Sequence, residues 1–84
     1  MKKTNLGILG GGQLGCMLCM AAKKLDVNTI VWSDDPMSPA KEFSDEFILS
    51  NYNDKEKFNY FTKKVDKITF EFENISFDIL NKLN

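Results

Sequence analysis

This sequence lacks histidine altogether, and it contains only two cysteines and two prolines among its 84 residues. Without histidine, any acid–base chemistry would fall to carboxylates, lysines or tyrosines. Two cysteines cannot supply the four ligands of a structural zinc site. No apolar run approaches the ~20 residues that span a bilayer. The net charge of −1 gives no electrostatic basis for binding nucleic acid or an anionic membrane surface. We therefore expect neither of these partners.

The composition is that of one small globular domain. Hydrophobic residues make up 43% and aromatic residues 12% of the chain, which excludes a disordered protein. A basic opening, Met1 to Lys3, leads into a strand and a glycine turn, not into the apolar core of a signal peptide. We expect a single domain over residues 1–84, in the cytoplasm.

The chain is organised around a glycine-rich turn that fits the pattern G-x-G-x-x-G, formed by Gly10, Gly11, Gly12, Gln13, Leu14 and Gly15. It follows a short apolar run, Leu6 to Leu9, and precedes residues with helical spacing, as a nucleotide-binding βα turn does. Backbone N–H groups at the helix start, with the positive end of the helix dipole, form a site for phosphate or another anionic group. A Walker A loop is excluded, because Gly15 is followed by Cys16 and Met17 and not by Lys and Ser/Thr.

Apolar spacing and turn residues predict alternating strands and helices. Strands are predicted over 5–9, 29–32, 45–49 and 67–72, and helices over 13–25, from about 53 to 64 and from 76 onward. Ser38 is predicted to cap a short helical turn that starts at Pro39, and Asn53 is predicted to cap the helix that follows. This order predicts an α/β fold, a Rossmann-like open parallel sheet with strand order 3-2-1-4 and flanking helices.

The first helix is apolar nearly all round. The predicted apolar stripe at three- and four-residue spacing is Leu14, Met17, Leu18, Ala21 and Leu25, yet Cys16, Cys19, Met20 and Ala22 are apolar too. A small sheet covers only one side of a helix, so we expect the other side to contact a second chain in a homo-oligomer. The C-x-x-C pair could be a redox site, but two small apolar side chains on a buried face is the preferred interpretation.

The point where strand order reverses lies between the first and fourth strands, and ligands bind there in open parallel sheets. The glycine loop should meet Glu71, Glu73 and Asn74 at this point. The two glutamates lie on one face of the predicted strand, about 7 Å apart. They form either a solvated acidic face or carboxylates that accept hydrogen bonds from ribose hydroxyls.

A second acidic position follows the second predicted strand. Asp34 and Asp35 stand about 20 residues after the last glycine, where dinucleotide-binding folds keep the acid that binds ribose. The alternative is a turn in which aspartate supports the backbone, and this is the preferred interpretation.

Four stretches, in register along the whole chain, resemble the carboxyaminoimidazole ribonucleotide synthases, the ATPase subunits of phosphoribosylaminoimidazole carboxylase. They are G-I-L-G-G-G-Q-L-G (7–15), D-P-M-S-P-A (35–40), S-D-E-F-I (44–48) and F-E-F-E-N-I (70–75). Members belong to the ATP-grasp superfamily, and use ATP and bicarbonate to carboxylate aminoimidazole ribonucleotide in purine synthesis. The resemblance implies an N-terminal domain that precedes the ATP-grasp domains. Those absent domains would bind ATP and Mg²⁺, so the chain alone should hold no cofactor and be inactive.

The resemblance also implies site residues. By similarity to glycinamide ribonucleotide transformylase, Gln13, Leu14 and Glu73 would contact the substrate ribonucleotide. The chain departs from the family at Cys16, where arginine is usual, and at Ser33, where aspartate is common. Two other functions remain open. The glycine loop and Asp34/Asp35 would suit an NAD(P)-binding module of an oxidoreductase, and the apolar helix would suit a non-catalytic interaction fragment.

Overall fold

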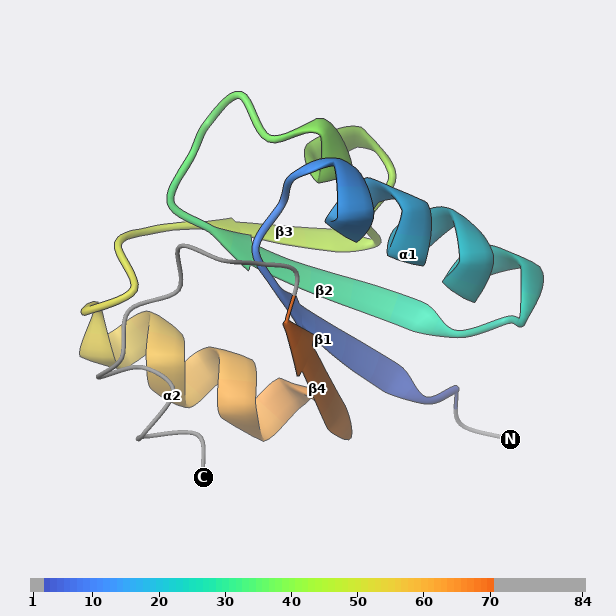
Figure 1. Ribbon diagram of the computed structural model, residues 1–84. Coiled ribbons are helices and arrows are strands. Elements are labelled where there is room, and N and C mark those ends of the chain that lie inside the picture. The colour runs from blue at the N-terminus through green and yellow to red at the C-terminus, as the bar shows by residue number, and fades with distance from the viewer. Residues whose placement is uncertain (1–2, 71–84) are drawn as a thin grey trace.

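A parallel sheet of four strands forms the centre of the protein, in a computed structural model that describes residues 3–70 (Figure 1). The elements in chain order are β1 (Asn5–Leu9), α1 (Gln13–Lys24), β2 (Asn28–Ser33), the 3₁₀ turn η1 (Pro39–Glu42), β3 (Glu46–Leu49), α2 (Lys55–Lys64) and β4 (Lys67–Phe70). All three strand pairings are parallel, and the order is β3-β2-β1-β4. The predicted α/β fold and strand order are confirmed. Glu71, Glu73, Asn74 and the helix predicted from Ser76 lie outside the described residues.

Each face of the sheet packs against its own layer of helix, because successive side chains on a strand point to opposite faces. One face, towards α2, buries Leu9, Ile30, Trp32, Ile48 and Phe61. The other face, towards α1 and η1, buries Ile8, Val31, Cys19 and Ala40 (Figure 1). Burial of both faces explains why β1 and β2 are continuously apolar in sequence.

Trp32 lies at the centre of the α2 layer. Its ring centroid lies 5.4 Å from that of Phe61 and 5.5 Å from that of Tyr52, in tilted arrangements. The indole N–H donates to the carbonyl of Ser50 at 3.1 Å, so the buried polar atom is paired. Gly7 makes room for this layer, since a Cβ on it would lie 2.7 Å from the ring of Phe61.

Most of the apolar stripe of α1 faces away from the sheet. Leu14, Met17 and Leu25 are 60%, 59% and 76% exposed, whereas Gly15, Cys19 and Ala22 are buried. The helix is rotated so that small residues face the sheet and η1, which allows close packing on both. The larger side chains of the predicted stripe therefore point away from the sheet, except Leu18, which is partly buried.

The cap of α2 lies one residue later than predicted. Asp54, not Asn53, is the N-cap, and its carboxylate accepts a hydrogen bond from the Lys57 amide at 3.1 Å. Asn53 instead donates its amide to the side chain of Asn51 at 2.8 Å, which forms a turn before the helix. The predicted inward residues are confirmed, with Phe61 buried and Phe58 and Val65 partly buried.

Acid should weaken the α2 cap. The Ser50 hydroxyl and then the Lys57 amide hold the pKa of Asp54 below its ordinary value. A lowered pKa contributes stability that is complete above about pH 4 and is lost as pH falls through the folded-state pKa. We expect the melting temperature of the wild type to fall towards that of Asp54→Asn, which keeps a cap oxygen but no charge, between about pH 4 and pH 2. A gap that stays constant over this range would contradict the assignment.

None of the helices in the described part of the chain is long and apolar enough to cross a membrane.

Candidate functional site

The glycine loop lies at the carboxyl end of the sheet, between β1 and α1. Gly10 has a positive φ of 105°, a backbone conformation that side-chain-bearing residues rarely adopt. Its amide donates to the carbonyl of Trp32 at 2.8 Å, so the loop begins tied to the end of β2. Gly10 is therefore required for the turn itself, as the motif predicted.

Gly11 is required for a different reason, a close approach to the segment that follows β2. A Cβ on Gly11 would lie 2.7 Å from both Cβ and Oγ of Ser38, and 3.1 Å from Cβ of Ser33. The Gly11 carbonyl also accepts a hydrogen bond from the amide of Ala40 at 3.0 Å. The loop is thus fixed by its neighbour in space, which the motif alone did not reveal.

Gly12 begins α1 and carries no side chain that could cap the helix. The first turn contains no acidic residue, so no side-chain carboxylate of this turn competes with a bound anion. Gln13 and Leu14 are both exposed at this end of the helix. The rotation of α1 that turns most of the apolar stripe away from the sheet thus leaves Leu14 accessible for the contact that the resemblance implies.

The turn after β2 has the geometry of an aspartate-supported turn. The Asp35 carboxylate accepts a hydrogen bond from the Met37 amide at 2.9 Å. This is the preferred interpretation from the sequence, and Asp34 beside it is exposed. Ser38 is the N-cap of η1 and Pro39 occupies the predicted first position, but the Ser38 side chain makes no capping bond. The Ser38 hydroxyl instead forms hydrogen bonds within the turn, with the Ser33 hydroxyl and the Asp35 carbonyl.

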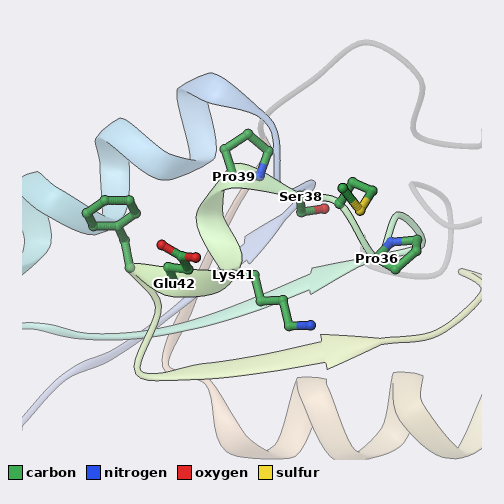
Figure 2. Close-up of a pocket in the computed structure, with 7 residues that line it drawn as sticks. Pro36, Ser38, Pro39, Lys41 and Glu42 are labelled. Atoms are coloured by element: carbon green, nitrogen blue, oxygen red, sulfur yellow. The ribbon is translucent and has the colours of Figure 1, made fainter.

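An open depression of about 660 Å³ lies along the same segment. One continuous stretch, residues 36–43, supplies its walls (Figure 2). Ser38 lies between Pro36 and Pro39 in this lining and is the residue that approaches Gly11, while Lys41 and Glu42 project from η1. A second depression, of about 490 Å³, lies beside the exposed face of α1 and the end of β4, lined by Leu14, Met17, Leu18, Ala21, Thr69 and Phe70. Of the predicted site residues, Leu14 lines the second depression, Gln13 and Asp35 are exposed, and Gly10 and Gly11 are buried. Glu71, Glu73 and Asn74 lie outside the described residues.

The two cysteines occupy different environments. Cys19 is 1% exposed, whereas Cys16 is only partly buried. Burial raises the pKa of the Cys19 thiol, against the opposing effect of a hydrogen bond with Thr29. Both thiols are free. This geometry agrees with the preferred interpretation of Cys19 as a small apolar residue of the packed face of α1.

Alkylation should therefore distinguish the two thiols. We expect iodoacetamide at pH 8 to modify Cys16 at least tenfold faster than Cys19, since only the thiolate reacts and burial blocks access to Cys19. Peptide mass mapping over time measures both rates, and the difference should vanish in urea. Equal rates in the native protein would contradict the burial of Cys19.

Within residues 3–70, no three Cys, Asp or Glu side chains are grouped closely enough to hold a metal ion. Residues 3–70 do provide a helix start with two exposed side chains, the amide of Gln13 and the apolar Leu14. The turn after β2 holds this helix start in place.

Residues 1–84 match the family described as the ribonucleotide synthetase preATP-grasp domain. The chain belongs to this family. It is 44% identical over 78 residues to the N5-carboxyaminoimidazole ribonucleotide synthase of Staphylococcus haemolyticus, and 40% identical over 80 residues to that of Staphylococcus epidermidis. Those matches cover 93% and 95% of this chain but 21% of each relative.

Solved structures of the preATP-grasp family agree with the fold. The N5-carboxyaminoimidazole synthetase of Staphylococcus aureus, in complex with ADP, superposes with a TM-score of 0.87 at 38% identity, over 99% of this chain and 22% of that one. The synthetase of Thermotoga maritima gives a TM-score of 0.83 at 39% identity, over 95% and 22%. The chain thus spans about a fifth of the length of these relatives. The resemblance read from the four sequence stretches is confirmed.

Proposed function

We propose that this chain provides the ribonucleotide-binding domain of an ATP-dependent ligase, a cytoplasmic carboxyaminoimidazole ribonucleotide synthase. In this reaction, bicarbonate is activated with ATP and transferred to the amino group of aminoimidazole ribonucleotide, a step of purine biosynthesis. Residues 1–84 act as one domain, and ATP and Mg²⁺ bind to the ATP-grasp part of the enzyme. Since the chain spans about a fifth of its relatives, we expect it to have no ligase activity alone.

The observation that supports this proposal is the shape of the glycine loop. Gly10 and Gly11 are held by β2 and by the turn after it, so the start of α1 is presented in one fixed position. A preorganised loop loses little entropy when a phosphate or sugar binds. Gln13 then offers an amide to the ribonucleotide, and Leu14 an apolar contact to its base or ribose.

Acidic and amide side chains complete the proposed site. Glu73 accepts hydrogen bonds from the ribose hydroxyls, with Glu71 and Asn74 as secondary contacts, and Asp35 approaches from the turn after β2. The glycines Gly10, Gly11 and Gly12 supply backbone N–H groups near the phosphate. The NAD(P)-binding alternative uses the same glycine loop, with Asp34 or Asp35 as the acid that binds ribose.

Ligand-induced stabilisation tests the proposal. We expect aminoimidazole ribonucleotide to raise the melting temperature of the chain, since a ligand at 100 times its Kd stabilises by about 2.7 kcal/mol. NAD and ATP should leave it unchanged, and ribose 5-phosphate serves as a control for phosphate binding alone. Stabilisation by NAD but not by the ribonucleotide would favour the oxidoreductase alternative.

A second candidate function, interaction with another copy of the chain, rests on the exposed apolar face of α1. Met17 and Met20 are exposed there, and Cys16 beside them is partly buried. We expect these side chains to be covered in a homo-oligomer. A monomeric mass by light scattering at millimolar concentration would reject this candidate.

A further inference from the structure

We propose that Ser38 is a positioning residue that holds the glycine loop in its ligand-binding shape, with Ser33 as its partner. This inference rests on the proposed function, because it concerns the same loop. Neither serine was among the predicted ligand contacts. Both are nearly inaccessible, with Ser33 3% and Ser38 7% exposed.

The two hydroxyls belong to a closed hydrogen-bond network. Ser38 Oγ donates to the carbonyl of Asp35 at 2.7 Å, and the Asp35 amide donates to Ser33 Oγ at 3.1 Å. The two hydroxyl oxygens lie 2.7 Å apart. Since each hydroxyl has one proton and that of Ser38 is used on Asp35, Ser33 donates to Ser38. The network therefore begins and ends on the backbone of Asp35.

This network packs directly against the glycine loop. Ser38 fills the space that a Cβ of Gly11 would occupy, at 2.7 Å. Two residues later, the Ala40 amide donates to the Gly11 carbonyl at 3.0 Å. The turn thus touches Gly11 by packing on one side and by a hydrogen bond on the other, and the position of Ser38 determines where both contacts lie.

Removing the Ser38 hydroxyl opens the network. Ser33 is left with a buried proton donor and no acceptor, which the turn can relieve only by moving. Movement of the turn carries the Ala40 amide and releases Gly11. A loop that is no longer held in one position must be ordered again when the ligand binds, which lowers affinity. Weaker binding is therefore expected although no residue that contacts the ligand is removed.

A matched control exists at the start of β2, the strand that ends at Ser33. Thr29 begins the buried part of β2, and its hydroxyl accepts a hydrogen bond from the Asp45 amide at 3.2 Å. Thr29→Val removes a buried hydroxyl and its hydrogen bonds, as Ser38→Ala does, but at the end of β2 away from the glycine loop. Both variants should lower the melting temperature by similar amounts.

Ligand binding separates the two variants. We expect Ser38→Ala to raise the Kd for aminoimidazole ribonucleotide about tenfold, the effect of about 1.4 kcal/mol, while Thr29→Val leaves the Kd unchanged. Ser33→Ala opens the network from its other side and replaces Ser38→Ala if that variant does not fold. The double variant Ser33→Ala/Ser38→Ala should bind no worse than either single variant. Either substitution alone already breaks the shared network, so the second adds no further effect. Equal Kd values for Ser38→Ala and wild type, or equal weakening in Thr29→Val, would overturn the proposal.

Amide exchange tests the positioning role without a ligand. We expect the Ala40 amide to exchange at least tenfold faster in Ser38→Ala than in wild type, with no such change in Thr29→Val. Failure of the wild type to bind the ribonucleotide would reject the proposed function, whereas unchanged exchange at Ala40 would reject the positioning role. The two failures are therefore distinguishable.

Discussion

Replacing Trp32 with alanine is expected to lower the free energy of unfolding by about 3–5 kcal/mol, as deletion of a large buried aromatic side chain does. Trp32 is fully buried and packs against Tyr52, Phe58 and Phe61. Its indole N–H also pairs with Ser50, so the variant leaves both a cavity and an unpaired carbonyl. A small domain has about 5–15 kcal/mol of stability in all, so a large part of it would be lost.

Urea unfolding followed by far-UV circular dichroism measures this loss, since Trp32 is the only tryptophan and its fluorescence disappears with it. Phe43→Ala is the matched control, because Phe43 is a large aromatic residue that is partly exposed. It should cost less than about 1 kcal/mol, as substitutions away from the packed core do. A similar small loss in Trp32→Ala would contradict the central place of Trp32 in the α2 layer.

Replacing Glu73 with glutamine is expected to weaken ribonucleotide binding roughly 10- to 150-fold. A hydrogen bond to a charged group contributes about 1.5–3 kcal/mol, and each 1.4 kcal/mol is a factor of ten in affinity. The prediction rests on the sequence and the resemblance, since Glu73 lies outside the described residues. A chimera in which residues 1–84 replace the matching segment of the Staphylococcus aureus synthase provides a complete enzyme for the measurement.

Calorimetric titration of this chimera with aminoimidazole ribonucleotide gives the affinity, and thermal unfolding of the 84-residue chain gives the stability. A ligand residue should change the first and leave the melting temperature almost unchanged. Glu71→Gln, a secondary contact in the proposal, should weaken binding less. Lower stability with unchanged affinity would show that Glu73 serves the fold instead.

Much of the fold could be predicted because its signals are local. Continuous apolar runs at β1 and β2 indicate strands buried on both faces, and the G-x-G-x-x-G turn indicates the junction of a strand and a helix. Alternation of strands and helices then permits few sheet orders, since crossovers are right-handed. The left-handed Gly10 also follows locally, because a sharp turn needs a residue without a side chain.

The face of α1 could not be predicted in this way. Its first half is apolar nearly all round, so the spacing of Leu14 and Met17 suited an inward stripe as well as that of Gly15 and Cys19. Hydrophobic periodicity predicts the buried face of a helix only where the opposite face is polar. The choice was made by packing, because small residues let α1 approach both the sheet and η1.

The sequence by itself determined the family, the parallel sheet and the place of the glycine loop, since each is encoded in residues close together along the chain. Only the tertiary structure decided what holds that loop. Ser38 lies 27 positions after Gly11 and contacts it because parallel strands bring their carboxyl ends to one edge of the sheet. Such a contact requires two separate segments to be positioned to within a few tenths of an ångström. No local pattern of residues specifies that position.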